Sequence, residues 1–148
     1  MEAFQAIEGL PVVRLLKASY LVYPLISAAH IAAIGTLLTS VALMDLRLMG
    51  AITSFPEAPY VALLRRLALS AFAVAAATGF LMFSVRASHY AQLPVFLAKM
   101  ALIGLAGANF LLFSLLSARD ARGTRLLAGV SLALWVAVLL CGRFIGFV

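Results

Sequence analysis

The chain has 148 residues, of which 66% are hydrophobic and 11% are charged. A soluble domain averages about 45–50% apolar and about 25% charged residues, so this composition is typical of a protein that lies in lipid. The net charge of +6 does not indicate a nucleic-acid partner, because the basic residues fall at the ends of apolar runs and form no stripe interleaved with aromatic residues. The single cysteine, Cys141, excludes an internal disulfide.

A short amphipathic helix is predicted over residues 4–17. Apolar residues recur there at helical spacing, at Phe4, Ile7, Leu10, Val13 and Leu16. Gly9 and Pro11 weaken or kink this helix. A segment of this kind suits the membrane interface beside a first span.

Four long apolar segments follow, at about residues 20–44, 60–85, 94–116 and 124–147. Each exceeds the ~20 residues needed to cross a ~30 Å hydrocarbon core, and backbone groups in lipid must be satisfied within their own segment. The breakers lie in short connections, so neighbouring helices are antiparallel. The sequence therefore predicts an all-α, single-domain bundle of four transmembrane helices.

The distribution of Lys and Arg predicts the orientation of the bundle. The side with the first and third loops carries Arg47, Arg65, Arg66, Arg119, Arg122 and Arg125. The opposite side carries Arg14, Lys17, Arg86 and Arg143, with Lys99 just inside the bilayer. Because cytoplasmic loops are richer in basic residues, we expect both termini outside the cytoplasm, in the periplasm.

His30 is the most informative candidate for a functional residue. It lies roughly 13 Å inside the first span, on a helical face that also carries Tyr23 and Ser27. A neutral imidazole in a membrane can ligate haem iron, contact a quinone, relay protons or form an interhelical hydrogen bond. These alternatives stay open, and His30 is the predicted metal ligand if iron is bound.

Three cations lie on the same side of the membrane as His30. Lys99 is about five residues inside the third span, where lysine either snorkels to the head groups or pairs with an anion such as a haem propionate. Arg86 and Arg143 end the second and fourth spans. We expect Lys99, Arg86 and Arg143 to surround the mouth of a cofactor pocket that has His30 at its floor, although ordinary head-group contacts explain each cation alone.

Other polar residues have simpler interpretations. His89 is in the short second loop, at a depth that disfavours bis-histidine haem ligation with His30. Asp45 and Arg47 are two residues apart, so they do not face each other on a helix, and we expect Asp45 to pair with Arg65, Arg66 or Arg119 in an interfacial ion network. Asn109 is expected to join two helices by a hydrogen bond.

Small residues recur at four-residue spacing in every span. They are Ala28, Ala32, Thr36 and Ser40 in the first span, Ala71, Ala75 and Gly79 in the second, Gly104 and Ala108 in the third, and Gly142 and Gly146 in the fourth. Such stripes let helix backbones approach closely, either within the bundle or across a homo-oligomer. The sequence offers no acidic residue near the middle of the membrane, which argues against a proton-coupled carrier.

Two segments resemble the HemJ-type protoporphyrinogen oxidases, small four-helix bacterial membrane proteins. The segments are Ser27-Ala-Ala-His30-Ile31 and Phe96-Leu-Ala-Lys99-Met-Ala-Leu-Ile103. CopD-type copper-resistance proteins resemble the first segment more loosely, and the overall pattern is similar to bacterial membrane families of unassigned function. The resemblance implies a bacterial inner-membrane location, haem b as cofactor, and functional roles for His30 and Lys99. The HemJ pattern has a further histidine where this chain has Phe110.

The sequence thus predicts a protein that binds haem b or a porphyrin, or else a quinone, within the membrane. It leaves open whether the protein is an enzyme. A rival interpretation is a non-catalytic accessory or scaffold subunit of a larger membrane complex. A small carrier or channel is the third.

Overall fold

The computed structural model describes residues 2–116 and 121–147, and this part of the chain is helical with no β-strand. Its elements are α1 (Glu2–Glu8), α2 (Pro11–Ala18), α3 (Val22–Leu48), α4 (Glu57–Val85), α5 (Ala87–Tyr90), α6 (Pro94–Leu116), α7 (Ala121–Phe144) and the short 3₁₀ helix η1 (Ile145–Phe147). Arg119, in the predicted third loop, lies outside the described residues.

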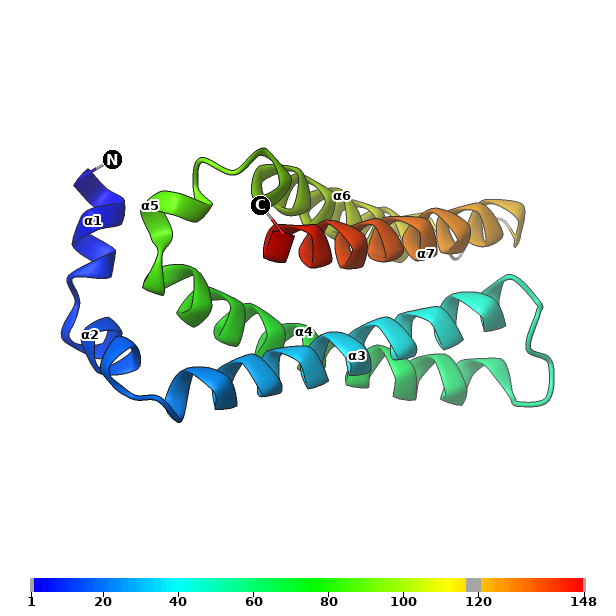
Figure 1. The fold of residues 1–148 in the computed structure, drawn as a ribbon. Helices are drawn as coiled ribbons and strands as arrows, with labels where there is room; N and C mark the ends of the chain where they lie inside the picture. The colour runs from blue at the N-terminus through cyan, green and yellow to red at the C-terminus, as the bar shows by residue number, and fades with distance from the viewer. Residues whose placement is uncertain (1, 117–120, 148) are drawn as a thin grey trace.

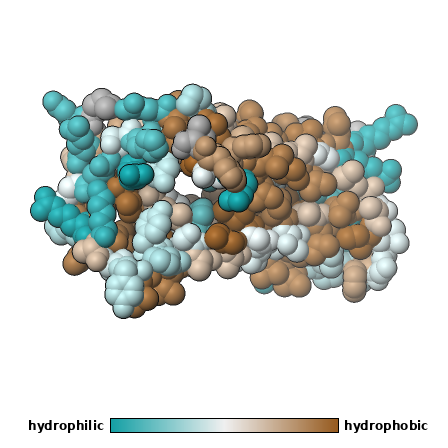
Figure 2. Space-filling model, in the orientation of Figure 1, coloured by the Kyte–Doolittle hydropathy of each residue, from teal (hydrophilic) through white to brown (hydrophobic). Residues whose placement is uncertain are grey.

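The four predicted spans are confirmed as four helices, α3, α4, α6 and α7, each long and apolar enough to cross a membrane. Their outer surfaces are strongly apolar. Ile31, Leu115 and Leu126 are 68%, 72% and 70% exposed, which would be unfavourable in water but suits contact with lipid tails. Figure 2 shows hydrophobic residues over the middle of the molecule and hydrophilic residues gathered toward its ends.

The spans form two antiparallel hairpins, α3–α4 and α6–α7 (Figure 1). The α3–α4 pair is packed most extensively, and α3 also contacts α7, which joins the hairpins. The core cluster comprises Leu37, Val41, Ala68 and Ala71, with Trp135 of α7 packed against it. The hairpins are thus held together near the end that carries the first loop.

The N-terminal segment is two helices, so the prediction of a single helix over residues 4–17 is wrong. The chain turns at Gly9, whose N–H donates to the carbonyls of Gln5 and Ala6, and α2 begins at Pro11. Proline is favoured in the first turn of a helix, where its missing N–H has no partner to lose. The predicted amphipathic character is present in α2, which buries Val13 and Leu16 and exposes Arg14 and Lys17.

The two N-terminal helices and α5 form a cap over the end of the bundle that carries the second loop (Figure 1). The Glu8 carboxylate accepts hydrogen bonds from the Ser88 amide at 2.9 Å and from the Ser88 hydroxyl at 2.6 Å. These bonds hold the pKa of Glu8 below its ordinary value, since they stabilise the ionised carboxylate. Phe4 packs edge-on against Phe83 of α4.

At the other end of the bundle, α3 runs four residues beyond the predicted end of the first span. It stops at Gly50, whose φ of +85° is a left-handed conformation that glycine adopts without strain. Asp45 and Arg47 are therefore inside the helix. Arg47 donates to Glu57 and to the Phe55 carbonyl, both at 3.1 Å, which confirms that it pairs away from Asp45.

The small-residue stripes differ in what they contact. Ala71 and Ala75 of α4 are buried in the bundle, as intramolecular packing predicts. In α3, Ser40 of the predicted stripe is buried, as is Ala33 outside it, while Ala28, Ala32 and Thr36 of the stripe are exposed. A side chain at Gly104 of α6 would meet nothing within 4 Å, so this glycine faces open space.

Candidate functional site

His30 is fixed at the interface between α3 and α4. Its Nδ1 lies 2.8 Å from the Thr78 hydroxyl oxygen. The ring packs flat against α4 at Gly79, where a Cβ would come within 3.0 Å of the imidazole Cε1. Gly79 therefore supplies the space that the ring occupies, because any larger residue would force the imidazole to move.

The hydrogen bonds around Thr78 favour one tautomer of the His30 ring. The Thr78 hydroxyl lies 2.7 Å from the Val74 carbonyl, to which it can donate its single proton. With its proton so placed, the hydroxyl accepts from the imidazole, an arrangement that assigns the ring proton to Nδ1. The Ala75 carbonyl, 3.3 Å from the same hydroxyl, is a second acceptor for this ring. The arrangement leaves Nε2 with its lone pair available as a ligand or acceptor.

Lys99 reaches toward the same region from the other hairpin. Its side chain lies along α7 at Gly142, where a Cβ would be 3.6 Å from the ammonium nitrogen. The ammonium interacts electrostatically with the His30 imidazole. The structure therefore brings the half-buried ammonium of Lys99, from α6, within electrostatic range of the half-buried imidazole of His30, from α3.

Arg86 and Arg143 lie at the same end of the bundle, but their contacts are with other groups. Arg86 is at the junction of α4 and α5 and interacts electrostatically with Glu8 of the cap and with Tyr23 of α3. The guanidinium of Arg143 lies 4.8 Å from the ring centroid of Phe147 in a cation–π contact. Both side chains are exposed.

An opening separates the two hairpins near the capped end. Figure 2 shows the molecule hollowed there, with hydrophilic residues at the rim of the opening. Tyr23, two helical turns before His30 on α3, interacts with Tyr90 of α5 at the cap. His89, by contrast, is exposed on α5 with its ring 5.6 Å from that of Tyr90, and it belongs to the cap.

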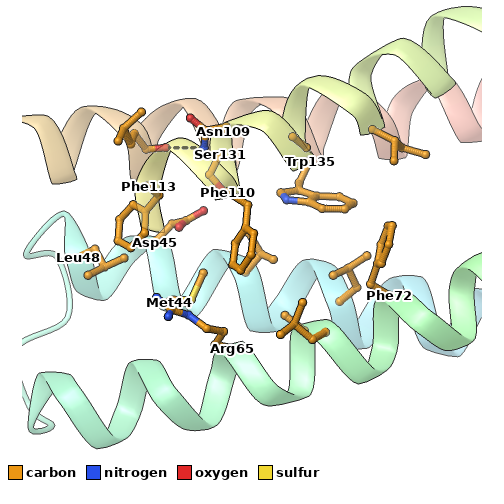
Figure 3. Close-up of a pocket in the computed structure, with 18 residues that line it drawn as sticks. Met44, Asp45, Leu48, Arg65, Phe72, Asn109, Phe110, Phe113, Ser131 and Trp135 are labelled. Atoms are coloured by element: carbon orange, nitrogen blue, oxygen red, sulfur yellow. Dashed lines mark hydrogen bonds between the residues drawn. The ribbon is translucent and has the colours of Figure 1, made fainter. Parts of the chain in front are cut away.

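A second polar group lies in the opposite half of the bundle, and sequence reasoning did not locate it. A cavity of about 150 Å³ opens between the four long helices there (Figure 3). Its polar lining residues come from all four of them: Asp45 from α3, Arg65 from α4, Asn109 from α6 and Ser131 from α7. Figure 3 shows Asp45 and Ser131 toward one end of the cavity and Trp135 and Phe72 toward the other.

The predicted ion network of Asp45 with Arg65 or Arg66 is wrong. Asp45 is only 2% exposed, forms an ion pair with neither arginine, and interacts through its side chain with Ser131 of α7. The Arg65 guanidinium lies about 6 Å from the ring centroids of Phe110 and Phe113 instead. Arg66 is exposed, because it lies on a different face of α4 from Arg65.

Asn109 behaves as predicted. Its side-chain amide donates to the Leu127 carbonyl of α7 at 3.1 Å, a bond that joins α6 to α7. The position of Asp45 in the sequence could have indicated this second polar group. Once α3 is extended to Leu48, Asp45 falls inside a spanning helix, where an ionisable residue suggests a functional site.

No protein-family model, no curated protein and no solved structure matches this chain. Among the described residues, no group of three or more His, Cys, Asp and Glu side chains is arranged to hold a bare metal ion. The fold and the composition of its surface define the class: a four-span helical membrane protein with two polar sites between its hairpins.

Proposed function

We propose that this protein binds haem b, or another porphyrin, within the membrane, where Nε2 of His30 would hold the haem iron. The observation that carries the proposal is the bond from His30 Nδ1 to Thr78. Metal-ligating histidines characteristically donate their second ring N–H to a neighbouring acceptor, which orients the ring and raises the basicity of the ligating nitrogen.

Lys99 has a complementary role in this proposal. A haem propionate in a membrane needs a cation, since an unpaired carboxylate is costly away from water. The Lys99 ammonium is within electrostatic reach of His30 from the facing hairpin, and Arg86 and Arg143 at the same end of the bundle can meet the second propionate or lipid phosphates. When bound, the haem would supply redox chemistry. A quinone is the alternative ligand for this opening, where Nε2 of His30 would accept a hydrogen bond from the hydroxyl of the reduced quinol.

The location we propose is the bacterial inner membrane, with the termini in the periplasm. The excess of Lys and Arg near the first and third loops supports this orientation. His30 would then lie in the periplasmic half of the bilayer and the cavity at Asp45 in the cytoplasmic half.

A haem titration of the purified protein in detergent tests the proposal. We expect the His30→Ala variant to bind haem at least about tenfold more weakly, and the matched His89→Ala variant to bind as the wild type does. Equal losses in both variants would contradict ligation by His30.

The role of Lys99 is tested by comparing haem with its dimethyl ester, which lacks the propionate charges. Lys99→Met should weaken the binding of haem about tenfold and leave the binding of the ester unchanged. Lys17→Met, which alters a lysine of the cap, serves as the control. Equal effects of Lys99→Met on haem and ester would show that Lys99 does not pair with a propionate.

A second candidate function is that of an accessory subunit in a larger membrane complex. Its support is the outward-facing glycine Gly104 of α6, which leaves space for the close approach of a helix from another protein. Stable co-purification with a larger complex, abolished by Gly104→Leu, would favour this function over cofactor binding.

A further inference from the structure

The cavity at Asp45 contains polar atoms that the chain itself does not satisfy. Asp45 Oδ2 and Arg65 Nε are both buried and have no hydrogen-bond partner. A buried polar group without a partner destabilises the folded state, so native proteins keep few of them and usually pair them with water or a ligand. Here two such atoms, an acceptor and a donor, belong to residues that line one cavity.

The rest of the cavity is apolar and aromatic. The rings of Phe72 and Trp135 meet edge-on at 6.1 Å between centroids, and Phe110 and Phe113 lie toward Arg65. A cavity of about 150 Å³ has the size that accommodates a single benzene-sized ring. An occupant that fits must therefore combine a flat apolar body with a small polar head.

Water alone does not fit the cavity well. A volume of about 150 Å³ corresponds to roughly five water molecules, each of which needs two to four polar partners. Asn109 donates its amide to the Leu127 carbonyl, and Ser131 interacts with Asp45, so few free polar groups remain. Most of those waters would rest against aromatic walls.

We propose that this cavity binds a hydroxylated aromatic ring, the chemistry shared by small phenols and by the head groups of membrane quinols. A ring hydroxyl donates to Asp45 Oδ2, the oxygens of the head accept from Arg65 Nε, and the ring packs among Phe72, Phe110 and Trp135. The site is independent of the proposed haem site, because Asp45 lies fifteen residues after His30, roughly 22 Å along α3.

A route into the cavity exists from the first-loop end. An open groove lined by Glu57, Val61 and Thr124, among others, shares Leu48, Arg65 and Phe113 with the cavity. A ring could therefore enter beside α4 without separation of the hairpins. A prenyl tail, if present, would remain among the apolar helix surfaces and lipid.

Trp135 reports on occupancy directly, because it is the one tryptophan of the chain and lines the cavity. Titrations followed by Trp135 emission and by calorimetry should show saturable binding of phenol. Anisole, which has the same ring but no hydroxyl proton, should bind at least about tenfold more weakly, since it cannot donate to Asp45. Equal affinities for phenol and anisole would overturn the proposal and leave a simple apolar void.

Two variants locate the site. Asp45→Asn should weaken phenol about tenfold and leave anisole unchanged, because only the bond to the carboxyl group is altered. Gly107→Leu should abolish phenol binding by filling the cavity, since a side chain at Gly107 meets nothing within 4 Å. Gly104→Leu, on the same helix but outside the cavity lining, is the matched control and should bind normally. Unaltered binding by Gly107→Leu would place phenol elsewhere.

A last comparison distinguishes the two sources of such a ring. A short-chain prenylated quinol that binds more tightly than bare hydroquinone would assign the cavity to membrane quinols. Equal affinities of the two would assign it to free phenols. Both outcomes require Gly107→Leu to remove the binding, and failure of haem to bind at His30 would leave this test unaffected.

Discussion

Replacement of Thr78 by valine tests the local structure on which the His30 site depends. The substitution keeps the shape of the side chain and removes the hydroxyl that contacts the imidazole. It leaves His30 Nδ1 facing a methyl group, with the Ala75 carbonyl as its remaining acceptor. We therefore expect a less stable α3–α4 interface and a less strictly oriented ring.

The magnitude follows from the geometry of the pair. The atoms are 2.8 Å apart and partly buried, which is near the ideal length for this bond. Side-chain hydrogen bonds between membrane helices contribute about 0.6 kcal/mol on average and at most about 1.7 kcal/mol. Because the pair is short and shielded, we expect Thr78→Val to lower the free energy of unfolding by about 1 kcal/mol.

The assay is reversible unfolding in mixed micelles of mild detergent and dodecyl sulfate. Thr36→Val is the matched control, because the Thr36 hydroxyl bonds only to the Ala32 carbonyl of its own helix. Its effect should stay within about 0.5 kcal/mol. A double-mutant cycle with His30→Ala should yield a coupling energy of about 0.6 to 1.7 kcal/mol. A coupling energy of zero, or equal effects of the two threonine variants, would show that the bond between His30 and Thr78 does not stabilise the α3–α4 interface.

Three further predictions concern the cap, the interhelical bonds and the orientation. Since the bonds from Ser88 lower the pKa of Glu8, the ionised carboxylate stabilises the cap above the ordinary carboxyl pKa of 4.5, and this contribution is lost as the pH falls below that value. Amide hydrogen exchange in α1, relative to its intrinsic rate, should therefore accelerate on acidification of the wild type. Glu8→Gln should remove this dependence on pH. Asn109→Ala should lower the free energy of unfolding by about 0.6 kcal/mol or more in the same micelle assay, because it removes the hydrogen bond to the Leu127 carbonyl. An unchanged free energy of unfolding would mean that this bond contributes nothing to stability. A tag at either terminus should react with a membrane-impermeant label from the periplasmic side, and labelling solely from the cytoplasm would reverse the orientation.

The architecture could be predicted from the sequence because the bilayer constrains it so strongly. Runs of more than ~20 apolar residues in lipid must be helices, and short connections make them antiparallel. The errors occurred where this constraint ends. At Gly9 and Pro11 the chain breaks one predicted helix into two, and α3 continues past residue 44 to Leu48, where Arg47 pairs with Glu57 at the start of α4.

The partners of the candidate residues were less predictable, since they depend on how each helix is rotated about its axis. Tertiary packing sets this rotation, and the apolar spans carry no periodicity that would reveal it. The sequence indicated that His30 needed a partner but not that Thr78 would supply it. The sequence also predicted an arginine as the partner of Asp45, whereas the orientation of α3 in the bundle directs the Asp45 carboxyl group toward Ser131.

The absorption spectrum of the purified protein, oxidised and dithionite-reduced, tests the central claim most directly. We expect a Soret band, present on isolation or after addition of haem, that sharpens on reduction. The band should be lost in His30→Ala and retained in His89→Ala. A protein that is colourless and takes up no haem, or whose Soret band survives in His30→Ala, would contradict haem ligation by His30.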